Sequence, residues 1–237
     1  MILAIIAGSL LAFVGLFIFA KAIWQYIIAV FFAVIFMGSI ALMTLNYTHH
    51  FGMKATNFVT KQKLYNAAET DVVKLLLYQP LGDGSEKVYL YKTEAQQKKV
   101  TVTKTDQVTN TVKTNQATAQ LVTTTKRWVY RSDLYRLLFG IADNNHEYIS
   151  QVNTFEIPAD WSVLSVAQAK AFGQLMNERK ASLAAEGKIY VTQQVTEAMM
   201  KNPKLSPAEQ GELVKKATAT YQAQAIAAAL AEVQKGN

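Results

Sequence analysis

The side chains best suited to chemistry in this 237-residue sequence are three histidines and the oxygen-bearing residues near them. His49 and His50 are adjacent, and neighbouring side chains on a regular helix or strand diverge, so one metal ion would rarely use both. His146 lies in the segment 143–147, Asp-Asn-Asn-His-Glu, whose oxygen atoms suit calcium. The segment lacks the spaced acidic residues and the glycine of a calcium loop. We therefore expect interfacial histidines at 49 and 50, a polar turn at 143–147, and no metal site.

The sequence contains no motif for catalysis or cofactor binding. It has no cysteine, which excludes thiol nucleophiles, thiolate metal sites and disulfides. Phosphate-binding loops, dinucleotide fingerprints, nucleophile elbows and zinc-protease motifs are also missing. A cell-envelope hydrolase would need paired carboxylates, and Asp133, Glu147 and Glu156 are available, but no spacing links them. We expect a protein without catalytic or cofactor-binding residues, and keep a hydrolase as a minor alternative.

A second candidate site is a cluster in which cations alternate with aromatic rings. Such clusters can bind glycans, lipid headgroups or nucleic acid, although packing across a β-sheet explains them equally well. The formal net charge of +7 is spread thinly along the chain, unlike the clustered basic stripe of a nucleic-acid-binding protein. We therefore expect no nucleic-acid partner, and hold the cluster as a candidate site for cell-wall polymer or lipid headgroups. Its members are Lys126, Arg127, Trp128, Tyr130 and Arg131.

Two apolar runs precede these candidate residues and determine where they are placed. Residues 1–20 and 22–47 carry no charged side chain and are separated only by Lys21. Each run reaches the roughly 20 residues that a helix needs to cross a bilayer, where backbone groups must pair internally. Ala20-Lys21-Ala22 resembles a signal-peptide cleavage site, but no basic region precedes it and a longer apolar run follows at once. The pattern predicts a retained transmembrane helical hairpin.

Small residues recur along both predicted membrane helices. Such residues allow close packing in lipid, so they form either a docking face for another integral membrane protein or the contact within the hairpin itself. The spans carry no charged residue, which argues against a transport path through the hairpin. The candidate docking residues are Ala4, Gly8 and Ala12 in the first helix, with Ala29, Ala33 and Gly38 as their counterparts in the second.

The rest of the chain predicts an α+β protein with three parts: the hairpin at 1–47, a β-rich domain at 48–160 and an α-helical region at 161–237. Alternating and β-branched residues predict strands near 71–78, 86–91, 98–105, 119–130 and 153–157, and a short helix at 133–139. A capping box at Ser165 predicts a helix that Gly187 ends, and Ser206-Pro207 predicts the start of another. The last helix has a mostly alanine apolar side, which suggests a partner or self-association.

The charge pattern gives conflicting signals about membrane orientation. Lys21 in the turn favours a cytoplasmic turn, whereas Lys54, Lys61 and Lys63 after the second span favour the opposite. The soluble part is rich in Thr, Lys and Gln, as exported surface domains often are. We therefore expect a cell-membrane protein whose soluble part is extracytoplasmic.

Five stretches of the sequence together carry a family resemblance: 45–53, 77–82, 87–92, 127–130 and 138–142. They resemble a domain-of-unknown-function family of small membrane proteins from lactic-acid-type Gram-positive bacteria. The resemblance covers about residues 1–170. It implies an association with multidrug efflux transporters of the major facilitator type, near which members are encoded, and it supplies no catalytic residues. We therefore expect a membrane-anchored accessory or scaffold protein, with an extracytoplasmic binding module as the alternative.

Overall fold

The computed structural model describes residues 1–68 and 73–235, which form two compact units. The first unit consists of Met1–Lys61, Thr105–Thr111 and Leu121–Thr154. The second consists of Gln62–Lys104, Val112–Gln120 and Phe155–Asn237. Helices at both ends of the chain and strands between them confirm the predicted α+β class.

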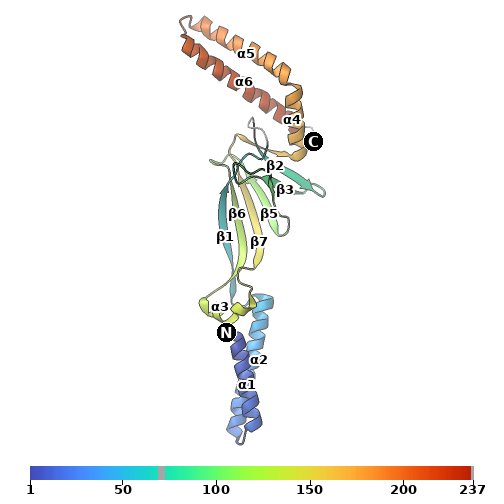
Figure 1. The fold of residues 1–237 in the computed structure, drawn as a ribbon, viewed down its shortest axis with the longest axis vertical. Coiled ribbons are helices and arrows are strands. Elements are labelled where there is room, and N and C mark those ends of the chain that lie inside the picture. The colour runs from blue at the N-terminus through green and yellow to red at the C-terminus, as the bar shows by residue number, and fades with distance from the viewer. Residues whose placement is uncertain (69–72, 236–237) are drawn as a thin grey trace. The chain divides into compact units, whose positions relative to one another are not determined.

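Two antiparallel helices, α1 (Ile2–Phe19) and α2 (Ile23–His49), form the predicted hairpin in the first unit (Figure 1). The Gln25 side chain holds the start of α2 by accepting a hydrogen bond from the Ala22 amide at 3.0 Å. Both helices are long and apolar enough to cross a membrane. At 1.5 Å per residue, α1 is about 27 Å long and α2 about 40 Å. The extra length of α2 extends past the start of α1 towards the sheet.

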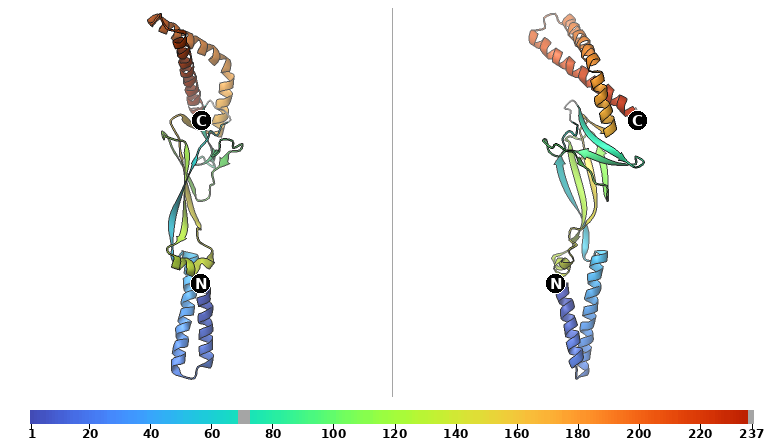
Figure 2. Two further views of the ribbon diagram at one scale, coloured as in Figure 1. Left: turned by 60° about the vertical axis from the view of Figure 1, so that its left-hand side comes forward. Right: turned by 45° about the vertical axis from the view of Figure 1, so that its right-hand side comes forward.

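The first unit also contains most of a four-stranded sheet whose strand order is β1-β6-β7-β5. These strands are β1 (Met53–Lys63), β5 (Val108–Lys113), β6 (Gln120–Tyr130) and β7 (Tyr148–Glu156). The helix α3 (Asp133–Phe139), at its predicted position, and the 3-10 turn η1 (Gly140–Ala142) connect β6 to β7. This connection brings α3 to the open end of the hairpin, as the views in Figure 2 show.

A second four-stranded sheet, with strand order β4-β3-β2-β8, lies in the second unit. Its strands are β2 (Lys74–Leu81), β3 (Glu86–Tyr91), β4 (Thr101–Val102) and β8 (Trp161–Ser165). Strands β2 and β3 are antiparallel, whereas β2 and β8 are parallel, with Lys74 opposite Trp161. Residues 71 and 72, which open the predicted strand 71–78, lie outside the described residues. The strand at 161–165 lies within the part of the chain predicted to be helical.

Three helices follow in the second unit: α4 (Val166–Glu178), α5 (Lys180–Lys201) and α6 (Pro207–Lys235). The helices α4 and α6 pack on β2 and β8 through a core formed by Val73, Leu75, Leu164, Phe172 and Ala229. The small side chain at 229 allows α6 to approach this core closely. The C-terminal half of α6 is therefore held by packing, although its apolar side is rich in alanine.

The predicted helix end at Gly187 is wrong. The helix breaks earlier, at Arg179, whose guanidinium forms two 2.9 Å hydrogen bonds with the Glu232 carboxylate on α6. Gly187 lies inside α5, where a Cβ atom would come within 3.1 Å of the Tyr221 ring. The glycine is needed for close packing of α5 on α6, and a contact between distant segments overrides its usual role as a helix stop.

Candidate functional site

The end of the hairpin meets the sheet of the first unit in a small apolar core, which we call the junction. Four buried side chains form it: Ile2 from α1, Met53 from β1, Tyr130 from β6 and Phe139 from α3. The chain leaves α2 through a sharp turn in which Gly52 has a φ of 79°. A Cβ atom at this position would overlap the Tyr135 ring, so only glycine fits here without a shift.

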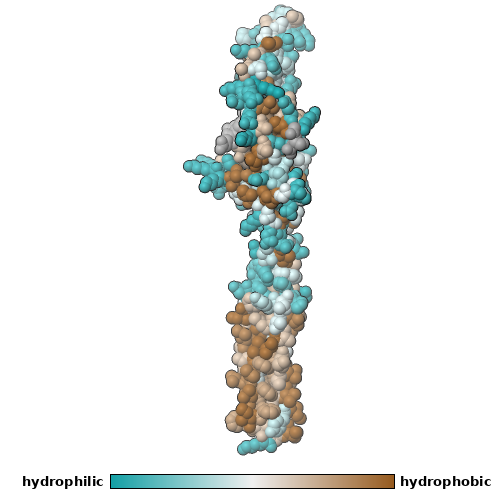
Figure 3. Space-filling model, turned by 90° about the vertical axis from the view of Figure 1, so that its right-hand side faces the viewer, coloured by the Kyte–Doolittle hydropathy of each residue, from teal (hydrophilic) through white to brown (hydrophobic). Residues whose placement is uncertain are grey.

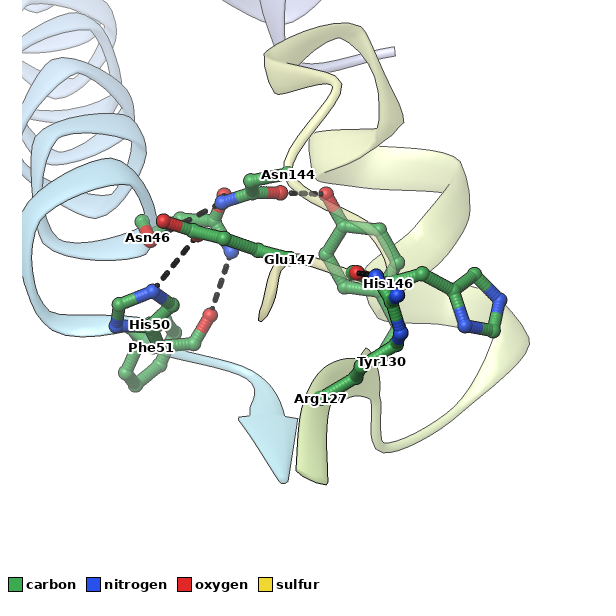
Figure 4. A network of polar contacts seen from close by, with 8 residues as sticks. All are labelled: Asn46, His50, Phe51, Arg127, Tyr130, Asn144, His146 and Glu147. Carbon is green, nitrogen blue, oxygen red and sulfur yellow. Dashed lines mark hydrogen bonds and ion pairs between the residues drawn. The ribbon is translucent and has the colours of Figure 1, made fainter. Parts of the chain in front are cut away.

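A buried polar network lies next to this apolar core and ties α2 to the β6–β7 connection (Figure 4). Asn144 Nδ2 donates to Asn46 Oδ1 at 3.1 Å, and Asn46 Nδ2 donates to the Phe51 carbonyl oxygen at 2.7 Å. The Tyr130 hydroxyl donates to Asn144 Oδ1 at 2.6 Å and lies 2.9 Å from the Phe139 carbonyl oxygen. Asn46 is fully buried, and Asn144 is 8% exposed. The side chains of Asn46, Tyr130 and Asn144 therefore rely on one another for hydrogen bonds.

Burial raises the pKa of the Tyr130 phenol above its ordinary value, and the nearby Asp143 carboxylate adds to the effect. The phenol therefore stays neutral at physiological pH and keeps its proton as a hydrogen-bond donor. Sequence reasoning assigned no role to Asn46 and treated Asn144 only as part of the polar turn at 143–147. The available signal was Asn46, an amide near the end of a helix without charged side chains, because a buried amide in that setting requires partners.

Charged and aromatic side chains surround the junction and make further internal contacts. The His50 ring stacks on Trp128, with ring centroids 4.4 Å apart, and its Nε2 atom lies 2.9 Å from a Glu147 carboxylate oxygen. Arg127 donates to the His146 carbonyl oxygen at 2.8 Å. Arg131 Nε donates to the Met53 carbonyl oxygen, also at 2.8 Å. These contacts give the site a structural role, because they join strand ends to the end of α2.

The predicted cation–aromatic cluster is therefore spread over different surroundings. Tyr130 is buried, Trp128 is stacked on His50, and both arginines donate to backbone carbonyl groups. Of the five members, Lys126 and Arg131 are exposed. The geometry favours the packing explanation, and polymer or headgroup binding at this cluster stays a prediction.

The small residues of the hairpin also divide into two groups. Ala29 on α2 is fully buried against α1, as packing within the hairpin requires. Ala4 and Gly8 are exposed, and Ala12 is half-buried. A Cβ atom on Gly8 would meet nothing within 4 Å. The outer face of α1 at residues 4 and 8 is therefore not used within the hairpin.

The candidate histidines and carboxylates make local contacts at different places in the structure. His49 Nδ1 lies 2.7 Å from the Thr48 hydroxyl, whereas His50 contacts Glu147. The segment 143–147 is the predicted polar turn, and its backbone is left-handed at Asp143 and His146. Asp133 pairs with Arg136 at 2.8 Å. Within residues 1–68 and 73–235, no three His, Cys, Asp or Glu side chains are grouped so that they could hold a metal ion.

The carboxylate of Glu156, in the second unit, accepts a 2.6 Å hydrogen bond from Gln120 Nε2. The same unit contains a groove of about 1010 Å³ between α5 and α6. Its walls are mostly apolar, with Leu183, Val191 and Ile226 among them, and Lys180 and Lys188 also line it. This groove is an open surface of a size that protein binding sites often have.

Comparison with known proteins places the chain in a family but adds no chemistry. Residues 21–172 match the family model described as a domain of unknown function, DUF4811. This range covers the second helix of the hairpin, both sheets and the start of α4. No curated protein and no solved structure matches the chain.

Proposed function

We propose that this chain is a membrane-anchored scaffold protein without catalytic activity. The chain belongs to the DUF4811 family, whose model matches residues 21–172. The observation that carries the proposal is the apolar outer surface of the hairpin, which Figure 3 shows in brown along both helices. Leu11, Phe19 and Ile23 are 73%, 76% and 78% exposed. A lipid bilayer would cover these side chains.

The free energy of removing these apolar side chains from water favours a hairpin in a bilayer over a hairpin in water. Twenty-two of the large apolar side chains of residues 1–47 are exposed on the surface of the hairpin. Covering one such side chain completely is worth about 1.5–3 kcal/mol, so their exposure to water would cost tens of kcal/mol. This cost exceeds the roughly 5–15 kcal/mol by which a typical domain is stable. The packing of Ile2 in the junction supports a first helix that stays with the protein.

The junction supports a scaffold over a flexible tether. The end of α2 bonds to the β6–β7 connection through Asn46 and Asn144, and Met53 packs beneath Tyr130. The hairpin and the sheet of the first unit therefore form one connected structure. Glu147 pairs with His50, and Arg127 and Arg131 are bonded to backbone carbonyl groups, which supports a role in positioning over catalysis.

We place the soluble part outside the cytoplasm, with Lys21 and its turn inside. The chain has no cysteine, so single-cysteine variants can be labelled without background. In intact cells, a membrane-impermeant maleimide should label Lys126→Cys and should label Lys21→Cys only after permeabilisation. The reverse pattern would show the opposite orientation.

The partner that we propose is an integral membrane protein, such as an efflux transporter, or another envelope component. The outward face at Ala4 and Gly8 is the surface to test. A photo-crosslinking residue at Gly8 should capture a protein in native membranes, while the same residue at Ile27, an exposed position on the other helix, serves as the control. If Gly8 captures only lipid or wall material, and neither a partner nor a second copy, the scaffold role fails. The extracytoplasmic binding module then replaces it.

A further inference from the structure

The short helix α3 and the turn η1 expose an apolar stripe that the fold does not use. Leu134, Leu137 and Ile141 are 62%, 56% and 60% exposed. They are spaced three and four residues apart, so they recur about once per helical turn. The other side of α3 faces the junction, where Phe139 is buried. The stripe is therefore a separate surface from the side of α3 that holds the fold together.

The stripe lies at the level where the apolar surface of the hairpin ends. The Met1 backbone nitrogen donates to the Leu137 carbonyl oxygen at 2.8 Å, and Ile2 packs with Phe139. The helix α1 is about 27 Å long, close to the roughly 30 Å of a bilayer hydrocarbon core. If α1 fills the core, its first turn lies at the lipid–water boundary, and α3 lies at the same depth.

We propose that α3 and η1 form an interfacial foot, in which Leu134, Leu137 and Ile141 insert into the headgroup–acyl boundary of the membrane that the hairpin spans. This inference rests on the membrane anchor proposed above. Continuity with the exposed surface of α1 identifies lipid as the occupant. Three side chains are also too few for a protein partner, because stable protein interfaces bury about 1,200–2,000 Å². Amphipathic helices bind membranes in this way, with apolar side chains in the acyl boundary and polar ones in the headgroups.

The polar residues of α3 fit this arrangement. Asp133 and Arg136 form an ion pair at 2.8 Å, and their side chains are 91% and 64% exposed. At the boundary they would remain among the headgroups and water. The foot and the hairpin together give the first unit two contacts with one membrane, which fix its depth and limit its tilt.

Spin labels on single cysteines test the foot directly, because the chain has no cysteine of its own. Three full-length variants are reconstituted into phosphatidylcholine–phosphatidylglycerol vesicles: Ile141→Cys for the foot, Arg136→Cys as the control on the same helix, and Leu11→Cys for the hairpin. All three positions are exposed, so the label should not disturb packing. Electron paramagnetic resonance then compares collisions with oxygen, which concentrates in lipid, and with a water-soluble nickel chelate.

We expect the Leu11 label to lie deep in the hydrocarbon, the Ile141 label just below the phosphates, and the Arg136 label in water. The proposed foot is refuted if the Ile141 label is as accessible to the nickel chelate as the Arg136 label while the Leu11 label remains protected. In that case the membrane anchor stands. If the Leu11 label is itself accessible to nickel, the anchor and the foot both fail.

Discussion

Replacing Asn144 with alanine tests whether the buried network holds the junction together. The substitution removes the 3.1 Å bond to Asn46 Oδ1 and the 2.6 Å bond from the Tyr130 hydroxyl. The hydroxyl retains the Phe139 carbonyl oxygen, 2.9 Å away, whereas Asn46 Oδ1 is left in a residue with no exposed surface. A buried polar atom without a partner costs about 1–3 kcal/mol, so we expect a loss of stability in this range.

The neighbouring Asn145 supplies the matched control, because its side chain is exposed. Asn145→Ala should change stability by less than about 0.5 kcal/mol. Urea unfolding of the full chain in detergent measures both variants. Trp128 reports on the junction, where it stacks on His50, in a background in which Trp24 and Trp161 are phenylalanine. Equal unfolding midpoints for the two alanine variants would refute the reasoning.

A double-mutant cycle separates the contact between the two asparagines from the other effects. Asn46→Ala and Asn144→Ala each break the same bond, so the double variant should be more stable than the sum of the single losses predicts. The expected coupling is about 1 kcal/mol, within the range found for contacting residues. Additive losses would mean that the bond does not contribute to stability.

Three further predictions follow from the geometry. Gly52→Ala should destabilise the junction by about 2–4 kcal/mol, because its φ is positive and a ring occupies the Cβ position, whereas Gly8→Ala should not destabilise it; thermal unfolding compares the two. The raised pKa of Tyr130 means that its contribution to stability is complete below about pH 10 and declines as pH rises towards the folded-state value; Tyr130→Phe should weaken this alkaline dependence in pH titrations of stability. Gly187→Val should cost about 1–3 kcal/mol by pushing on the ring 3.1 Å away, whereas Gly173→Ala, in open space, should be neutral or stabilising in the same unfolding assay.

Local sequence signals predicted the elements that are determined by hydrogen bonds between residues close together in the sequence. The charge-free runs gave the hairpin, because a helix satisfies its own backbone groups. The capping box at Ser165 gave the start of α4, and both of its hydrogen bonds with Gln168 are present, at 2.9 and 3.0 Å. The Ser206 hydroxyl likewise contacts the Glu209 amide at the start of α6, at 3.3 Å. Such signals involve residues three positions apart and need no knowledge of the rest of the fold.

Contacts between distant segments could not be predicted in this way. The pairing of β8 with β2 joins Trp161 to Lys74, 87 residues earlier, so an isolated reading of residues 161–165 gives no strand. At the break between α4 and α5, Arg179 bonds to Glu232, 53 residues later. Each of these features requires a partner that the local pattern does not reveal.

The candidate site shows the same contrast between local sequence signals and contacts with distant segments. Residues 126–131 include the end of β6, and Tyr130 and Trp128 from this segment pack in the junction. The prediction that these residues bind an external ligand came from their types alone. The structure shows that the rings and guanidinium groups have internal partners up to 78 residues away. Residue types alone do not reveal such partners, because the partners lie far away in the sequence.

The position of the junction explains why such a small site contains so many polar contacts. Backbone groups beyond the end of α2 can no longer pair within the helix, and side chains of the junction, such as Met53 and Asn46, are buried from water. An unpaired amide or carbonyl group is costly there. Asn46 accepts from Asn144 and donates to the Phe51 carbonyl oxygen, and Arg131 Nε covers the Met53 carbonyl oxygen. The network therefore allows the chain to change from the helix α2 to the strand β1 within three residues while the buried side-chain amides of Asn46 and Asn144 keep hydrogen-bond partners.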